Sequence, residues 1–201
     1  MAEFEAALEK LLQVEGGWCD VPGDKGGETF CGISRKNWPF WDGWRFIARA
    51  KTHHSFEEGP EIFTAYLSTL PGLQRQVEEF YRSKFWKKTC CETMPQDLAE
   101  EVFEQAVNMG VFRAVLHLQK ALNAMNFFEG QPLFEDLEED GVLGVHTKSA
   151  VEVLLRKRSQ NDLLAVLNHL QACRYIDLAA AQSSQRKFLR GWMTRTKQEV
   201  A

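Results

Sequence analysis

The sequence has no long apolar run and no excess of basic residues, and both absences narrow its function. No stretch reaches the ~20 apolar residues that a membrane-spanning helix needs, so we expect no stable membrane insertion. Lys and Arg number 24 against 28 Asp and Glu, a net charge of −4. Nucleic-acid-binding domains usually carry a basic excess, so this balance argues against a nucleic-acid partner.

Cysteines are few and lack the spacing of a cofactor or disulfide site. There are five, an odd number, and the adjacent Cys90 and Cys91 lack the CxxC spacing of a redox or zinc pair. We interpret them as thiols of a protein made in a reducing compartment. The pair His53-His54 lacks the HExxH pattern, so we expect no metal. The acidic first ten residues do not resemble a signal peptide, and we expect synthesis in the cytoplasm without one.

The apolar spacing favours helices through most of the 201 residues. Phe4, Leu8 and Leu11 form one stripe and predict a helix over 3–14, ended by Gly16-Gly17. Six glycines and Pro22 predict a short hairpin or irregular β-ribbon over 16–32. Its tight turns are expected at Pro22-Gly23 and Gly26-Gly27. Further helices are predicted over 61–70, 73–87, 96–108, 111–125, 146–157, 161–180 and 184–197.

Two stretches between these helices have a distinct composition. Residues 34–60 are rich in tryptophan and predict short helices joined by loops. Trp38, Trp41 and Trp44 suit either sugar stacking or core packing, and core packing is the commoner role. Residues 127–140 hold six acids and predict a solvated loop. The fold class we expect is mainly α with one small Gly-rich β-hairpin near the N-terminus.

The residues that carry chemistry lie in segment 15–33, which reads EGGWCDVPGDKGGETFCGI. Glu15 stands at the end of a predicted helix beside Trp18. The helix dipole and an apolar neighbour both raise the pKa of a carboxyl there, as a general acid requires. Asp24 follows nine residues later, and Thr29 offers a hydroxyl for a water. An acid, a carboxylate and a hydroxyl suit hydrolysis of a glycosidic bond.

This segment resembles the N-terminal signature of the glycoside hydrolase family 108 lysozymes, which are N-acetylmuramidases of the "secretion activator" type. The resemblance continues through three further blocks that are similar to the C-terminal peptidoglycan-binding region paired with that fold. These blocks are FEQAVNMG at 103–110, LQKAL at 118–122 with DGVLGVHT at 140–147, and FLRGWMTR at 188–195. The resemblance implies a lysozyme-like region over 1–95 and a peptidoglycan-binding region over 96–201, packed as one globule.

Carried over to this chain, the resemblance implies roles for individual residues. Glu15 is the implied catalytic acid, with Asp24 and Thr29 in support. The family often has an acid where this chain has Val21, so the neighbouring Asp20 and Asp24 can exchange roles. Glu104 stands where the family commonly has Asp. Expected substrate contacts are Trp18, Gly26, Gly27 and Asn108.

The resemblance implies a bacteriolytic muramidase that cleaves the β-1,4 bond between N-acetylmuramic acid and N-acetylglucosamine. Its partner is the peptidoglycan glycan strand, it needs no cofactor, and we expect a monomer. A prophage origin and release to the cell wall by a holin-like pore are also implied. Three alternatives remain open: a non-catalytic peptidoglycan-binding or secretion-assisting protein, a lytic transglycosylase, and an amidase that uses Cys19 or Cys31. The basic C-terminal residues suit either wall docking or a solvated helix face.

Overall fold

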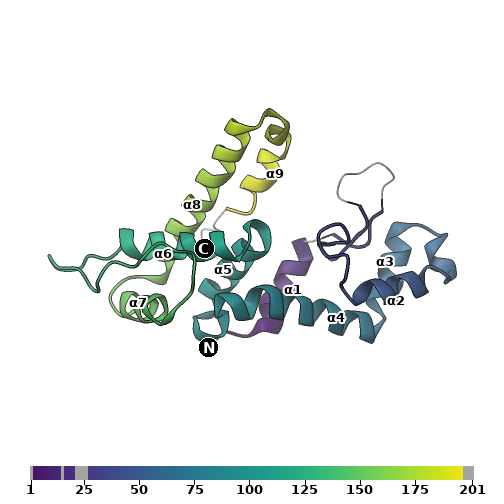
Figure 1. Cartoon of the computed structure of the whole chain (residues 1–201), viewed down its shortest axis with the longest axis horizontal. Coiled ribbons are helices and arrows are strands. Elements are labelled where there is room, and N and C mark those ends of the chain that lie inside the picture. The colour runs from purple at the N-terminus through teal and green to yellow at the C-terminus, as the bar shows by residue number, and fades with distance from the viewer. Residues whose placement is uncertain (1, 15, 21–26, 197–201) are drawn as a thin grey trace. The chain divides into compact units, whose positions relative to one another are not determined.

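The computed structural model describes residues 2–14, 16–20 and 27–196 (Figure 1). The chain divides into two compact units. The N-terminal unit comprises Phe4–Lys84, and the C-terminal unit comprises Phe85–Ala201 with Met1–Glu3. Helices predominate in both, and the sheet found among the described residues has two short antiparallel strands. The mainly α fold with a small N-terminal hairpin is therefore confirmed.

The described part of the N-terminal unit combines helical segments and the hairpin, and the π-helix η2 (Arg82–Trp86) begins at its end. Apolar positions spaced by three and four residues place Phe4, Leu8 and Leu11 on a buried face of its first helix. The third and fourth helices begin with Pro60 and Pro71, where the missing N–H of proline costs nothing. The elements are α1 (Phe4–Val14), β1 (Thr29–Phe30), β2 (Ile33–Ser34), α2 (Gly43–Ala50), η1 (His54–Phe56), α3 (Pro60–Ser68) and α4 (Pro71–Tyr81).

The hairpin turns at two residues that the sequence did not single out. Cys31 and Gly32 have φ values of 47° and 75°, both in the left-handed region, as the favoured two-residue hairpin turn requires. Phe30 pairs with Ile33, and both side chains are buried. The predicted ribbon is thus confirmed over its last residues, and its tight turn lies at Cys31 and Gly32, after the positions expected from the sequence. The turn expected at Pro22-Gly23 lies outside the described residues, as does Gly26 of the other.

The tryptophans of segment 34–60 pack inside the N-terminal unit. Trp44 is 3% exposed, and its indole N–H donates to the backbone oxygen of Trp38 at 2.7 Å. Trp41 meets Trp44 edge to face, with ring centroids 5.0 Å apart. Trp38 meets Phe80 of α4 in the same way at 4.9 Å. Core packing therefore accounts for Trp44, whereas Trp38 and Trp41 pack against the core and are half-buried.

The described part of the C-terminal unit is mostly helical, with one long segment without helix between α6 and α7. In Figure 1, α9 lies back alongside α8, the longest helix of this unit. The predicted helix over 184–197 is wrong, because the structure has a 3-10 turn and one short α-helix there. Serine and glycine, present here as Ser183, Ser184 and Gly191, have low helix propensity. The elements are η3 (Lys87–Thr89), η4 (Cys91–Thr93), α5 (Gln96–Met109), α6 (Val111–Ala124), α7 (Val145–Leu155), α8 (Gln160–Ala181), η5 (Ser183–Phe188) and α9 (Leu189–Met193).

Helix ends in this unit follow local sequence signals. Gly110 has a φ of 89° and separates α5 from α6, because glycine adopts this conformation without a steric penalty. The Ser159 hydroxyl accepts the backbone N–H of Asn161 at 3.1 Å and caps α8. Segment 127–140 contains no helix and is the predicted acidic loop. Each described helix is too short or too polar to cross a bilayer.

Candidate functional site

Three of the expected site residues lie outside the described residues: Glu15, Asp24 and Gly26. Their roles stay predictions. The structure does describe the chain on both sides of them, and the remaining candidates fall in different units. Trp18, Asp20, Gly27 and Thr29 belong to the N-terminal unit, and Asn108 belongs to the C-terminal unit.

A backbone bridge closes the loop that contains Asp24. The N–H of Cys19 donates to the oxygen of Thr29 at 3.0 Å, and the N–H of Thr29 donates to the oxygen of Cys19 at 2.8 Å. Asp20 therefore starts the loop next to the residue where the loop ends. Thr29 is half-buried, and within the described chain its hydroxyl has no hydrogen-bond partner. Its expected role in holding water or substrate stays a prediction.

Among the described residues of this region, Glu28 is the buried carboxylate, and sequence reasoning missed it. The residue is 6% exposed. Its Oε1 accepts a hydrogen bond from the indole N–H of Trp18 and pairs with the ammonium of Lys51, and both nitrogens lie 3.0 Å from it. Its Oε2 accepts the guanidinium of Arg35 at 2.5 Å. Three donors from separate segments therefore meet on one side chain.

These donors keep Glu28 ionised. Burial alone raises the pKa of this carboxyl, but the hydrogen bonds from Trp18, Lys51 and Arg35 and the charge of Lys51 outweigh it. The net result is a pKa below the ordinary glutamate value. A general acid must carry a proton near neutral pH. Glu28 therefore does not suit the acid role and acts instead as an anchor.

Lys51 connects this anchor to Asp20. Its Nζ lies 3.0 Å from Glu28 and 3.8 Å from Oδ2 of Asp20. The same ammonium stands over the rings of Trp18 and Phe56, 5.5 and 5.6 Å from their centroids. A cation over an aromatic face is attracted by the ring quadrupole. Asp20 is thereby placed as an ion-paired carboxylate at the start of the loop.

Trp18 is fixed by contacts on several sides. Its backbone N–H donates to Oγ1 of Thr64 at 2.8 Å. Its ring meets Phe63 edge to face with centroids 5.0 Å apart. At Gly17 any side chain would collide with Thr64, because a Cβ there would lie 2.4 Å from Cγ2 of that residue. Glycine at this position thus permits the close approach of the chain to α3.

The sequence carried only a weak signal for this anchor. Glu28 sits inside the Gly-rich motif, seven residues before Arg35, but nothing local marks it as buried. Lys51 follows α2 and Thr64 lies in α3, both outside the motif. Only the tertiary fold brings Lys51 to the carboxylate of Glu28 and Thr64 to the backbone of Trp18. Sequence reasoning therefore had no means of selecting them.

Asn108 belongs to a polar cluster of the C-terminal unit. It is exposed, and its Oδ1 accepts the hydroxyl proton of Tyr175 at 3.1 Å. Glu104 accepts a hydrogen bond from Gln171 and another from Arg195, each at 2.8 Å. Arg195 belongs to the block at 188–195 and Glu104 to the block at 103–110. The ion pair therefore joins these two blocks and gives Glu104 a structural role.

Gln119 joins the two parts of the remaining block, 118–122 and 140–147. It is 2% exposed, and its Oε1 accepts the backbone N–H of Gly141 at 2.8 Å. Its Nε2 donates to Oδ1 of Asp140 at 2.8 Å and to the oxygen of Val142 at 3.1 Å. The hydrogen bonds that Asp140 accepts from Gln119 and from the backbone N–H of Val142 lower the pKa of Asp140. Segment 140–144 is therefore ordered by one buried amide.

Replacing Gln119 with alanine is expected to lower the free energy of unfolding by about 2–3 kcal/mol, because Gly141 and Asp140 lose their partner. Urea denaturation of both proteins measures the loss. Gln131→Ala serves as the control, since Gln131 is exposed. Equal losses in the two variants would contradict the role given to Gln119.

Buried His117 makes stability depend on pH. Its Nδ1 lies 3.0 Å from Oε1 of Gln105. Burial, reinforced by the charges of Arg113, Lys120 and Arg174, lowers the pKa of His117 to about 4. The unfolded chain, with a histidine pKa of 6.5, binds this proton more readily than the folded one. Protonation of His117 therefore favours unfolding. The stability that protonation removes is fully present only above the pKa of the unfolded chain.

We expect this histidine to destabilise the wild type progressively as the pH falls from 6.5 toward 4. His117→Gln lacks the titrating group, so its free energy of unfolding should fall less over the same interval. Denaturation at several pH values measures both curves. Parallel curves would show that His117 does not titrate in this way.

The described thiols and histidines form no metal site. No group of three His, Cys, Asp or Glu side chains within residues 2–14, 16–20 and 27–196 is placed to hold an ion. No disulfide joins the five cysteines, all of which lie in the described residues, and burial raises the pKa of Cys91 to about 12. Cys19 is exposed and Cys31 is half-buried at the hairpin turn. Cys91 is therefore inert as a nucleophile near neutral pH.

Comparison with known proteins gives two family matches, one after the other along the chain. A family model described as "Glycosyl hydrolase 108" matches residues 8–110, and one described as "Predicted Peptidoglycan domain" matches residues 113–197. No curated protein matches the chain. Together the two family matches indicate a function related to peptidoglycan.

Among solved structures, the chain is similar to SagA of Brucella abortus. The two are 23% identical, with a TM-score of 0.59, and the alignment covers 96% of this chain and 88% of SagA. At this identity the likeness establishes the fold, which is lysozyme-like with helices predominating. The glycosyl hydrolase 108 model covers half of the chain and includes the segment around Glu28 and Thr29. The chain therefore belongs to the glycosyl hydrolase 108 family.

Proposed function

We propose that this protein is a muramidase that hydrolyses the β-1,4 bond between N-acetylmuramic acid and N-acetylglucosamine in peptidoglycan. The observation that carries the proposal is the order of Glu15, Asp24 and Thr29 in a segment that matches the glycosyl hydrolase 108 model. Glu15 donates a proton to the leaving oxygen, and the ionised role belongs to Asp24 or Asp20. Thr29 holds water or substrate through its free hydroxyl.

The Glu28 anchor supports this assignment of roles. Its carboxylate is committed to three donors, so it does not compete with Glu15 for the acid role. It also ties the indole of Trp18 to Lys51, and Lys51 lies beside Asp20. The anchor thereby fixes the described residues on both sides of the loop. A fixed frame of this kind is what positioned catalytic groups require.

Release of reducing ends from purified peptidoglycan tests the proposal. The wild type should release them steadily, and the walls should lose turbidity. Glu15→Gln should bind the walls and release almost none. A wild type that sediments with the walls without releasing reducing ends would overturn the proposal in favour of a non-catalytic binding protein.

The setting of this activity is also proposed. The protein acts on the cell wall as a prophage lysin and reaches it through a holin-like pore. A fusion of the first thirty residues or so to a reporter enzyme measures export directly. Export of the fusion by the general secretion machinery would contradict this route.

A further inference from the structure

Lys51 joins the two chain segments that the Cys19–Thr29 backbone bridge brings together. The bridge pairs Cys19 with Thr29 in the antiparallel sense. Asp20 follows Cys19 on one segment and Glu28 precedes Thr29 on the other, so the two carboxylates stand next to the bridge, one on each segment. The ammonium of Lys51 lies 3.8 Å from Asp20 and 3.0 Å from Glu28. One cation thus connects both segments beside the backbone bridge.

Without this cation the two carboxylates would repel each other. Like charges at facing positions of an antiparallel pair are destabilising. Glu28 has a second cation, Arg35, on its other oxygen. Among the residues that the structure describes, Asp20 pairs with Lys51 alone. The neutralisation of Asp20, and with it the close approach of the two segments, therefore depends on Lys51.

The position of Lys51 is itself fixed. It is the residue after α2, and its backbone N–H donates to the oxygen of Ile47 at 3.1 Å, one turn back along the helix. Its ammonium stands over the rings of Trp18 and Phe56, which meet edge to face with centroids 5.6 Å apart. A lysine held at both ends loses little further side-chain entropy when it forms an ion pair. It can therefore hold the two carboxylates in place.

The residues that Lys51 holds are those that the proposed reaction needs. Asp20 is one of the two candidates for the ionised role, and Thr29 directly follows Glu28. A displacement of about 1 Å at a reacting group can lower a rate by roughly 100-fold. Loss of Lys51 is therefore expected to lower the rate of cleavage through Asp20 and Thr29.

We propose that Lys51 is a positioning residue for glycan cleavage, because its pairing with Asp20 and Glu28 keeps Asp20 and Thr29 side by side. The inference rests on the muramidase function proposed above and assigns a role to a residue outside the catalytic motif. Lys51 acts through these residues and transfers no proton to the sugar.

Hydrogen exchange in the full-length protein measures this holding effect without any substrate. The amide hydrogens of Cys19 and Thr29 bond to the opposite segment and should exchange slowly in the wild type. Lys51→Met keeps a long side chain but removes the charge, so both amides should exchange about tenfold faster. Lys51→Arg should keep most of the protection. Adding Asp20→Asn to Lys51→Met removes the repulsion and should restore part of it.

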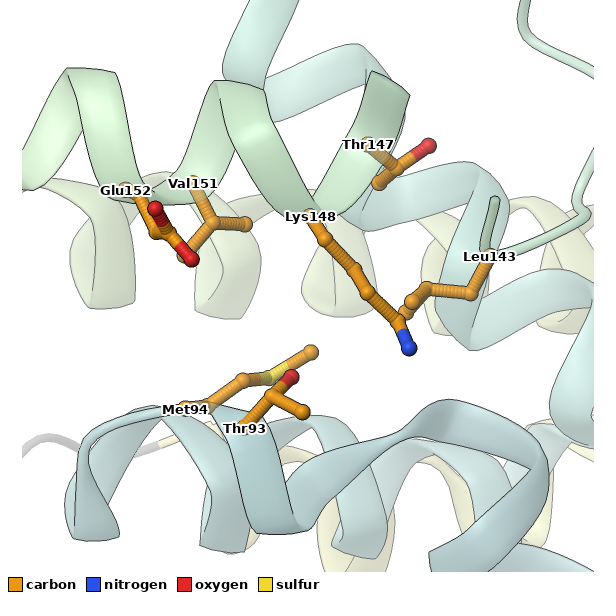
Figure 2. A pocket seen from close by; sticks show the side chains of 7 residues that line it. All are labelled: Thr93, Met94, Leu143, Thr147, Lys148, Val151 and Glu152. Carbon is orange, nitrogen blue, oxygen red and sulfur yellow. The ribbon is translucent and has the colours of Figure 1, made fainter. Parts of the chain in front are cut away.

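Cleavage of soluble peptidoglycan fragments by the folded proteins measures the catalytic effect. Lys51→Met should lower kcat about tenfold or more with KM within about threefold, and Lys51→Arg should recover most of the loss. Lys84→Met is the matched control, because Lys84 also stands over a tryptophan ring, that of Trp38, at 5.4 Å. Lys148→Met is a second control, because Figure 2 shows Lys148 beside a hollow that only residues of the C-terminal unit line. Both controls should match the wild type.

The outcomes separate this inference from the muramidase proposal. Unchanged exchange of the Cys19 and Thr29 amides in Lys51→Met would overturn the inference. A loss confined to KM, or a Lys51→Arg variant no better than Lys51→Met, would also overturn it. An active wild type that Lys51→Met equals would overturn this inference alone, whereas a wild type that cleaves no glycan would overturn both proposals.

Discussion

Replacing Glu15 with glutamine is expected to lower the rate of glycan cleavage at least about 100-fold, because a positioned general acid contributes ~10²–10⁴-fold. Glutamine keeps the size of the side chain but has no proton to donate to the leaving oxygen. Reducing-end release from purified peptidoglycan at saturating enzyme measures the loss. Affinity for the wall should change little.

The control for this substitution is Glu9→Gln. Glu9 lies on α1, the helix that precedes Glu15, and is exposed. The same loss of charge there should leave cleavage within about twofold of the wild type. If Glu15→Gln kept more than about a hundredth of the wild-type rate while folding normally, Glu15 would not be the acid.

Replacing Glu28 with glutamine is expected to lower the free energy of unfolding at neutral pH by about 2–3 kcal/mol. Loss of one partner from a buried ion pair costs roughly 3–5 kcal/mol. The side chains of Arg35 and Lys51 are 46% and 28% exposed, so water compensates part of that cost. Glu57→Gln, at an exposed position, is the control and should cost little.

The pH dependence of this loss tests its electrostatic origin. The pKa of Glu28 in the folded protein is below that of the unfolded chain, so the stabilisation is complete above about pH 4.5. It is lost as the pH falls through the lowered folded value. The difference between wild type and Glu28→Gln in urea denaturation should therefore narrow in acid. A difference that stays constant down to pH 3 or so would mean that the charge of Glu28 contributes nothing.

Helical periodicity predicted most elements of the fold because it depends on local sequence. The spacing of Phe4, Leu8 and Leu11 is enough to place α1, and Pro60 and Pro71 mark the starts of α3 and α4. The last predicted helix, over 184–197, was wrong. The structure shows a 3-10 turn before a short helix there, and Gly191 has a low helix propensity.

The sequence predicted only those candidate site residues that lie together in one short motif. The motif identified Glu15, Asp24 and Thr29 as candidates and led to the family that the match of residues 8–110 confirms. It did not identify Glu28 as the residue that three donors share. Lys51 reaches that carboxylate only through the tertiary fold, and no spacing along the chain encodes such a contact.

Mass spectrometry of peptidoglycan digested by the wild type and by Glu15→Gln tests the central claim most directly. The account predicts muropeptides that end in reducing N-acetylmuramic acid, present with the wild type and absent with the variant. Anhydro ends would identify a lytic transglycosylase. Released stem peptides with intact glycan strands would identify an amidase or peptidase. Either of these products would contradict the assignment of this chain as a muramidase with Glu15 as its acid.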